Sequence, residues 1–167
     1  MRPAGRGETD SLYFDYPHFP PPSAREGLSA PCPVAIVGAG PVGMTAALAL
    51  AREGVASVLL DAKSTFNDGS RAICVSRSSF RILDRIGALA PFLDKALPWT
   101  TGRSFYRGQQ ILEFDMPDGP GEKFRPMYNI QQQFIEQYLW DAVAREPLID
   151  ARWQSRVTGA TDTPSGV

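Results

Sequence analysis

The sequence has few of the residues on which metal sites and activated nucleophiles depend. Its only histidine, His18, lies in a proline-rich stretch, and its two cysteines are Cys32 and Cys74. Two cysteines are too few for a disulfide framework or a four-thiolate metal site. A single histidine argues against histidine-based zinc or non-haem iron sites and against a Ser-His-Asp triad. No metal is therefore expected, and the chemistry should come from a bound cofactor or from residues outside these 167.

An excess of charge of either sign is also lacking. Lys and Arg number 17 and Asp and Glu number 18, which gives a formal net charge of −1. This balance does not indicate a nucleic-acid partner, and there is no acidic tail. Hydrophobic residues make up 43% and charged residues 21% of the chain, proportions typical of a soluble globular domain. We therefore expect a soluble protein of the cytoplasm.

Residues 30–51 form a run of 22 residues without a charge, long enough to suggest a membrane span. The run contains three prolines and three glycines, and four of these six lie in its middle (Gly38, Gly40, Pro41, Gly43). A lipid-facing helix does not tolerate so many breakers. The segment before the run carries acidic residues and is too long for a signal peptide. The sequence therefore predicts no membrane span.

Residues 1–33 are predicted to form a proline-rich N-terminal arm, distinct from the domain that follows. Prolines favour an extended or polyproline conformation, and six of them lie between positions 17 and 33. The aromatic residues of the arm are unusual for a free tail and favour packing on a surface (Tyr13, Phe14, Tyr16, Phe19). Disorder is the alternative, and the sequence does not decide between the two.

A strand, a glycine-rich turn, a helix and a second strand follow one another from residue 34. The apolar run of residues 34–37 predicts a buried parallel strand. Residues 44–52 are rich in alanine and leucine and predict a helix, which Gly54 ends. Residues 57–60 predict the second strand, with Asp61 directly after it. This order predicts a βαβ unit and an α/β fold.

The turn between the first strand and the helix has the sequence GAGPVG, residues 38–43. Its GxGxxG spacing, after a strand and before a helix, is the pattern of dinucleotide-binding turns. Gly38 permits a tight turn, Gly40 leaves room for a pyrophosphate, and Gly43 lets the helix lie close to the sheet. Pro41 and Val42 stand at the helix N-terminus, where free N–H groups and the helix dipole attract phosphates.

Asp61 completes this pattern. It lies 23 residues after Gly38, close to the spacing at which an acidic residue binds the hydroxyls of a ribose. A carboxylate at this place disfavours a 2′-phosphate. The pattern predicts that the turn residues and this acid bind a dinucleotide, although FAD and NAD share it (Gly38, Gly40, Pro41, Val42, Gly43, Asp61). The alternative is a βαβ unit whose glycine-rich turn binds nothing.

The rest of the chain predicts a mixture of helices and short strands without an internal repeat. Apolar residues at helical spacing indicate helices, and alternating apolar runs between turn residues indicate strands. Helices are predicted at residues 78–86 and 133–145, a hairpin at 103–106 and 110–114, further strands at 127–130, 148–153 and 156–160, and a turn at 161–166. Because the chain ends one residue after this turn, we expect it to be the N-terminal fragment of a longer protein.

Two segments after the βαβ unit resemble FAD-dependent aromatic hydroxylases, the class A flavoprotein monooxygenases. Residues 69–74, with the sequence GSRAIC, and the helical segment at residues 78–87 are similar to the 3-(3-hydroxyphenyl)propionate hydroxylase-like and phenol hydroxylase-like members. The resemblance implies that Arg71 reaches the phosphate and ribose region of FAD. The alternative for Arg71 is a solvated loop arginine.

The second segment, residues 128–139, is similar to a strand-to-helix segment of the same family. The resemblance implies that the glutamine four residues before Glu136, which is Gln132, contacts FAD. Because Gln131 and Gln133 flank it, a shift by one residue stays open, as does a simple polar helix start. Residues 152–159 resemble the strand whose backbone, near Val157, receives the adenine.

The resemblance implies an α/β, Rossmann-like FAD-binding domain of the glutathione-reductase type, of which residues 34–167 are the N-terminal part. It also implies a full-length monooxygenase that uses FAD, NAD(P)H and dioxygen to hydroxylate a small aromatic, phenolic substrate. The family's Asp-Gly and Gly-Asp motifs lie further downstream. No residue of this chain is therefore nominated as catalytic, and this chain alone is expected to be inactive.

Two other functions stay open at this point. One is another FAD-dependent oxidoreductase on the same scaffold, such as an epoxidase or a halogenase. The other is a binding module that holds a nucleotide without turnover. An NAD dehydrogenase is disfavoured because it needs neither the Ser70-Arg71 segment nor the Gln132 segment. The sequence does not indicate an oligomeric state.

Overall fold

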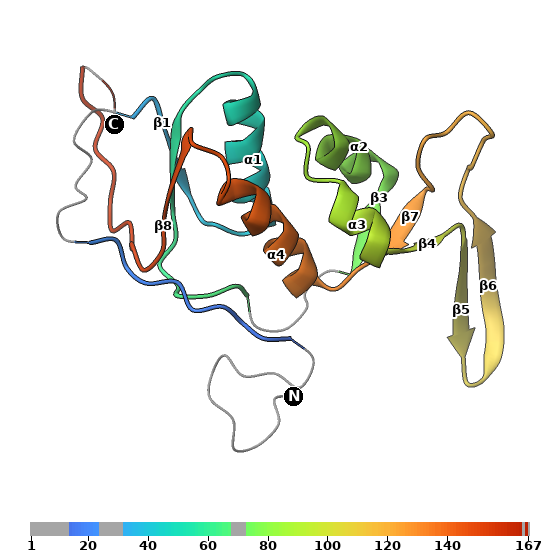
Figure 1. The fold of residues 1–167 in the computed structure, drawn as a ribbon. Helices are drawn as coiled ribbons and strands as arrows, with labels where there is room; N and C mark the ends of the chain where they lie inside the picture. The colour runs from blue at the N-terminus through green and yellow to red at the C-terminus, as the bar shows by residue number, and fades with distance from the viewer. Residues whose placement is uncertain (1–13, 24–31, 68–72, 165, 167) are drawn as a thin grey trace.

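The computed structural model describes residues 14–23, 32–67, 73–164 and 166, and its first layer is a parallel sheet (Figure 1). The strands β1 (Val34–Val37), β2 (Ser57–Leu60) and β8 (Ile149–Arg152) lie in the order β1-β2-β8. Both neighbouring pairs are parallel, with Val34 opposite Ser57. The middle strand, β2, is almost entirely buried, as expected of a parallel strand that is covered on both faces.

Two helices pack together beside this sheet. α1 (Pro41–Arg52) joins β1 to β2, and its buried residues follow the i, i+3, i+4, i+7 spacing of one helix face (Met44, Ala47, Leu48, Ala51). α4 (Gln132–Val143) lies next to α1 in Figure 1 and leads into β8. The buried hydrophobic residues of both helices join Leu59 of β2 and Ile149 of β8 in one hydrophobic cluster.

A second sheet, with shorter strands, lies near the N-terminal end of α4. β3 (Cys74–Ser76), β7 (Met127–Asn129) and β4 (Leu97–Trp99) are antiparallel in the order β3-β7-β4. α2 (Arg77–Arg85) and α3 (Ala90–Lys95) accompany this sheet. Phe80 of α2 stacks on Tyr128 of β7, with ring centroids 3.7 Å apart and planes 12° apart. Aromatic stacking therefore attaches α2 to the antiparallel sheet.

A hairpin of β5 (Thr101–Tyr106) and β6 (Gln109–Asp115) extends away from both sheets (Figure 1). Its turn residues Arg107 and Gly108 have φ angles of +48° and +80°, the region that two-residue hairpin turns favour. Arg103 of β5 donates a hydrogen bond of 2.7 Å to Glu113 of β6. This bond holds the pKa of the Glu113 carboxyl below its ordinary value.

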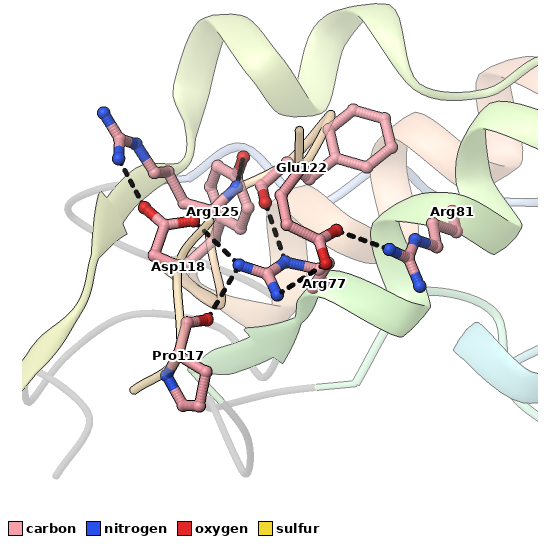
Figure 2. Close-up of polar contacts among 8 residues, drawn as sticks. Arg77, Arg81, Pro117, Asp118, Glu122 and Arg125 are labelled. Carbon is pink, nitrogen blue, oxygen red and sulfur yellow. Dashed lines mark hydrogen bonds and ion pairs between the residues drawn. The ribbon is translucent and has the colours of Figure 1, made fainter. Parts of the chain in front are cut away.

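The loop between β6 and β7 is fastened to α2 through Arg77 (Figure 2). The Arg77 guanidinium donates to the main-chain oxygens of Phe124 at 2.8 Å and Pro117 at 3.0 Å, and to the Asp118 carboxylate at 2.8 Å. Arg77 also forms an ion pair of 3.4 Å with Glu122. Glu122 pairs in addition with Arg81, and Asp118 pairs with Arg125. Because the Arg77 and Asp118 side chains are only 16% and 15% exposed, solvent screens their attraction weakly. The network thereby fixes the loop that leads into β7.

Residues 14–23 of the predicted arm pack against the parallel-sheet part of the structure. Phe19 stacks on Trp153, with ring centroids 4.3 Å apart and planes 16° apart. Its N–H donates to the main-chain oxygen of Ser64 at 2.8 Å, and its own main-chain oxygen accepts from Gln154 Nε2 at 2.8 Å. Of the two alternatives for the arm, packing on a surface rather than disorder therefore holds for residues 14–23. Residues 1–13 and 24–31 of the arm lie outside the described residues.

The predicted α/β fold and its βαβ unit are confirmed. β1 and β2 have the predicted bounds, whereas α1 begins three residues earlier than expected, at Pro41. Proline suits the first turn of a helix because its fixed φ is helical and its missing N–H would have no partner there. The hairpin, the two predicted helices now called α2 and α4, and the strands now called β7 and β8 are confirmed with small shifts of their ends. α3 was not predicted.

The strand predicted at residues 156–160 is wrong. The chain leaves β8 through Gln154, whose φ is +55°, and residues 156–160 are exposed and irregular. The Ser155 N–H donates to the main-chain oxygen of Asp61 at 2.7 Å, which holds the chain at the end of β2. Residues such as Val157 favour a strand only where a neighbouring strand offers a ladder. None of the described strands pairs with this segment.

The uncharged run of residues 30–51 enters the parallel-sheet part of the fold. Its described residues, 32–51, include β1, the glycine-rich turn and nearly all of α1. Within the described ranges of the chain, no helix has the length and apolar character needed to cross a membrane.

Candidate functional site

The glycine-rich turn joins β1 to α1 at the carboxyl end of the parallel sheet. Gly38 has a φ of +106°, a backbone conformation that residues with a side chain rarely adopt. Its N–H donates to the main-chain oxygen of Leu60 at 2.7 Å, so the turn stays attached to β2. Gly40 caps α1 and offers no side chain to the first N–H groups of the helix. The positive end of the helix dipole and these N–H groups make the turn suitable for an anion.

Gly40 and Gly43 have opposite surroundings. A Cβ added to Gly40 would meet no atom within 4 Å, so the space beside this N-cap residue is open. A Cβ added to Gly43 would lie 1.9 Å from the main-chain oxygen of Gly38 and 3.3 Å from Cγ2 of Ile36. The absence of a side chain at Gly43 therefore lets α1 approach β1. The absence of one at Gly40 leaves the space that a pyrophosphate would need.

Asp61 follows β2 and turns its carboxylate toward the glycine-rich turn. Its Oδ2 accepts from the Ala39 N–H at 2.8 Å, and its Oδ1 accepts from the Lys63 N–H at 2.9 Å. Its own N–H donates to the main-chain oxygen of Arg152 at 3.0 Å. Each carboxylate oxygen can accept about two hydrogen bonds, so capacity remains for ribose hydroxyls. The structure thus brings the predicted acid into direct contact with the predicted turn.

The other predicted residues take different positions. Pro41 and Val42 are the first two residues of α1, and Val42 is 84% exposed. Val157, 41% exposed, lies in the irregular segment that Ser155 attaches to Asp61. Arg71 lies outside the described residues. The turn, Asp61 and the Val157 segment therefore share the carboxyl end of the parallel sheet.

Gln132 begins α4 and is 8% exposed. Its Nε2 donates to Oε1 of Glu136 at 2.7 Å. Of its neighbours, Gln131 is exposed, and Gln133 has a buried Oε1 that lacks a hydrogen-bond partner within the described part of the chain. The three consecutive glutamines therefore have different surroundings, and the side chain of Gln132 is the one bound to a buried carboxylate.

Sequence reasoning used Glu136 only to locate Gln132 and missed its place in the structure. Glu136 is 1% exposed and accepts hydrogen bonds from Asn67 as well as from Gln132. The signal that could have found it is the helical spacing of positions 132, 136, 139 and 143, which places this carboxylate on the buried face of α4.

A largely apolar cavity of about 380 Å³ borders the first turn of α1. Pro41 and Val42 line it from α1, Ile82 from α2 and Ile135 from α4. The predicted phosphate-binding turn therefore opens next to a hollow between the two parts of the structure. The described residues contain no group of three or more His, Cys, Asp or Glu side chains able to hold a metal ion.

Comparison with protein families identifies a match over most of the chain. The family described as "FAD binding domain" matches residues 31–167. A 3-(3-hydroxy-phenyl)propionate/3-hydroxycinnamic acid hydroxylase of Mycobacterium sp. (strain JLS) is 30% identical over 138 residues, covering 80% of this chain and 24% of the relative. The FAD-dependent monooxygenase apdD of Emericella nidulans is 28% identical over 158 residues, covering 82% and 25%. The chain thus spans about a quarter of the length of these curated relatives.

Solved structures show the same fold. The p-nitrophenol 4-monooxygenase PnpA from Pseudomonas putida DLL-E4 superposes with a TM-score of 0.70 at 23% identity, covering 80% of this chain and 37% of that one. The flavin-dependent monooxygenase PieE, crystallised in complex with FAD and substrate, superposes with a TM-score of 0.64 at 25% identity, covering 75% and 24%.

Proposed function

The chain belongs to the FAD-binding domain family, and on this basis we propose that it forms the adenosine and pyrophosphate part of the FAD site of an aromatic-ring monooxygenase. In this proposal the whole protein uses NAD(P)H and dioxygen to hydroxylate a small phenolic substrate. Relatives named as hydroxylases of 3-(3-hydroxyphenyl)propionate support that substrate class. We also propose the cytoplasm, where NAD(P)H is available, as its location.

The observation that carries this proposal is the open space at Gly40. Gly40 is the N-cap residue of α1, and a Cβ added to it would meet no atom within 4 Å. The Asp61 carboxylate stands beside it through its 2.8 Å bond to the Ala39 N–H. A dinucleotide contains a pyrophosphate, which needs free N–H donors, and a ribose, whose hydroxyls need an acceptor. The turn offers the N–H donors and Asp61 offers the acceptor. The residues present therefore fit FAD.

FAD, when bound, supplies the electron transfer and the oxygen chemistry, whereas the protein binds and orients it. The N–H groups at the start of α1 would hold the pyrophosphate, with Gly38 and Gly40 keeping the approach open. Asp61 would accept hydrogen bonds from the adenosine ribose. Arg71, Gln132 and Val157 are proposed as further contacts on the basis of the family resemblance.

The full-length gene product tests this function directly. We expect it to purify with stoichiometric FAD and to oxidise NAD(P)H faster when a phenolic acid is added, with formation of a hydroxylated product. The measurements are the flavin absorption spectrum, the rate of NAD(P)H oxidation and product analysis by mass spectrometry. Bound FAD without a response to phenols would favour an epoxidase or a halogenase. A bound nucleotide without any turnover would favour a binding module.

A second expected result concerns Asp61. Asp61→Ala should weaken FAD binding by about 1–3 kcal/mol, roughly 5- to 150-fold, because the ribose hydroxyls lose their acceptor. Equilibrium dialysis of the full-length gene product against FAD measures the effect. Asp94→Ala, which removes an exposed carboxylate from α3, is the control and should bind like wild type. An unchanged FAD dissociation constant in Asp61→Ala would refute the assignment.

A further inference from the structure

We propose that Glu136 is a positioning residue of the FAD site, since its buried carboxylate joins the segment after β2 to the first turn of α4. This inference rests on the proposed function. It assigns to Glu136 no contact with the cofactor. Glu136 would act through Asn67 and Gln132, which it holds in place.

The burial of Glu136 is unusual. It is 1% exposed, and the other buried polar residues within the described ranges, Ser57, Gln132 and Gln133, carry no charge. A carboxylate removed from water is costly unless hydrogen bonds replace its hydration. Glu136 therefore needs its donors, and the way they are supplied indicates what it does.

Three N–H groups from two separate segments supply these donors. The Asn67 main-chain N–H donates to Oε2 at 2.7 Å, and Asn67 Nδ2 donates to Oε1 at 2.7 Å. Gln132 Nε2 also donates to Oε1 at 2.7 Å. Because Asn67 uses both its backbone and its side chain on different oxygens, its position and its orientation are fixed together. Hydrogen bonds to an ionised acceptor are about twice as strong as neutral ones.

The two segments joined in this way are those that carry predicted cofactor contacts. Asn67 lies in the segment that begins at Asp61, and Phe66 anchors that segment in the core at 2% exposure. Gln132 is the residue that the family resemblance selects on α4. With its Nε2 held by Glu136, the amide of Gln132 keeps one orientation. One carboxylate therefore sets the relative placement of the strand end and the helix start.

An amide cannot replace the carboxylate in this network. A glutamine has nearly the same shape, but it presents one acceptor oxygen and an NH₂ group that would face other N–H donors. Glu136→Gln therefore keeps the packing of α4 while it releases Asn67 or Gln132. The substitution separates a role in positioning from a role in filling space.

The test uses the full-length gene product and compares four variants by FAD binding and by thermal unfolding. Glu136→Gln is expected to raise the FAD dissociation constant about tenfold at a temperature well below unfolding. Asn67→Ala, which removes the side-chain hydrogen bond from Asn67 to Glu136, should also raise the FAD dissociation constant. The double variant should be little worse than either one, because both changes remove one interaction.

Val143→Ala is the matched control, since Val143 is 1% exposed, lies two turns further along α4 and shares its buried face. It should lower the melting temperature and leave the FAD dissociation constant within about twofold of wild type. An unchanged FAD dissociation constant in Glu136→Gln, or fully additive effects with Asn67→Ala, would overturn the inference. If Glu136→Gln does not fold, wild-type FAD affinity in Asn67→Ala would overturn it instead. FAD binding by the wild-type protein is measured first. If the wild-type protein does not bind FAD, the proposed function fails, and this outcome is distinct from a failure of the inference about Glu136.

Discussion

Gly40→Val is expected to abolish FAD retention while the protein stays folded. A Cβ added to residue 40 would meet no atom within 4 Å, so we expect the fold to accept a small side chain there. The same side chain would occupy the space in front of the α1 N-terminus, where the pyrophosphate is proposed to lie. We expect FAD binding to weaken by about a hundredfold or more, roughly 3 kcal/mol. Flavin content after purification and the far-ultraviolet circular dichroism spectrum measure the two halves of this prediction.

A glycine elsewhere in the chain provides the control for Gly40→Val. Gly119 lies in the exposed loop between β6 and β7, and an added Cβ there would also meet no atom within 4 Å. Gly119→Val should therefore keep both the fold and the flavin. Purified Gly40→Val that carries as much FAD as wild type would mean that the glycine-rich turn is not the phosphate site.

Gly43→Ala is expected to have the largest effect on stability. In a helix interior the change from glycine to alanine normally stabilises by about 1 kcal/mol. Here the new Cβ would lie 1.9 Å from the main-chain oxygen of Gly38 and 3.3 Å from Cγ2 of Ile36. The main chain cannot move aside as a flexible side chain can, so α1 would have to separate from β1 and expose Met44, which is now fully buried. We expect the free energy of unfolding to fall by about 3 kcal/mol or more.

Urea unfolding of Gly43→Ala and Gly40→Ala measures this contrast within one turn. Gly40→Ala should change the free energy of unfolding by no more than about 1 kcal/mol, the usual range for a helix cap. Helix propensity alone predicts a more stable Gly43→Ala, whereas the close approach of α1 to β1 predicts a less stable one. A Gly43→Ala protein as stable as wild type would contradict the packing described for this turn.

The resemblance to FAD-dependent monooxygenases, carried by the residues at 69–87 and 128–139, is confirmed by the family match and by the relatives. The individual roles of Gly38, Asp61, Gln132 and the other predicted contacts stay predictions. The structure adds geometry to them, since it joins Asp61 to the turn through Ala39. It describes no position for Arg71.

The sequence alone determined the βαβ unit, the glycine-rich turn and the acid after β2. These features depend on interactions between residues close in the chain and on backbone conformations that particular residues require, as Gly38 shows with its φ of +106°. Beside a glycine-rich turn and an adjoining helix, a short apolar run indicates a buried parallel strand. For this reason β1 and β2 were predicted with their observed bounds.

Only the tertiary structure decided the features that need a distant partner. The three-residue strands β3 and β4 exist because β7 lies between them, and residues 156–160 form no strand because no described strand lies beside them. Phe19 could be placed only by its stacking on Trp153. Helical spacing indicates the buried face on which Glu136 lies, but its partner Asn67 comes from a segment 69 residues earlier. A short strand, an aromatic side chain or a buried carboxylate has several comparable environments available locally, and the long-range contact selects among them.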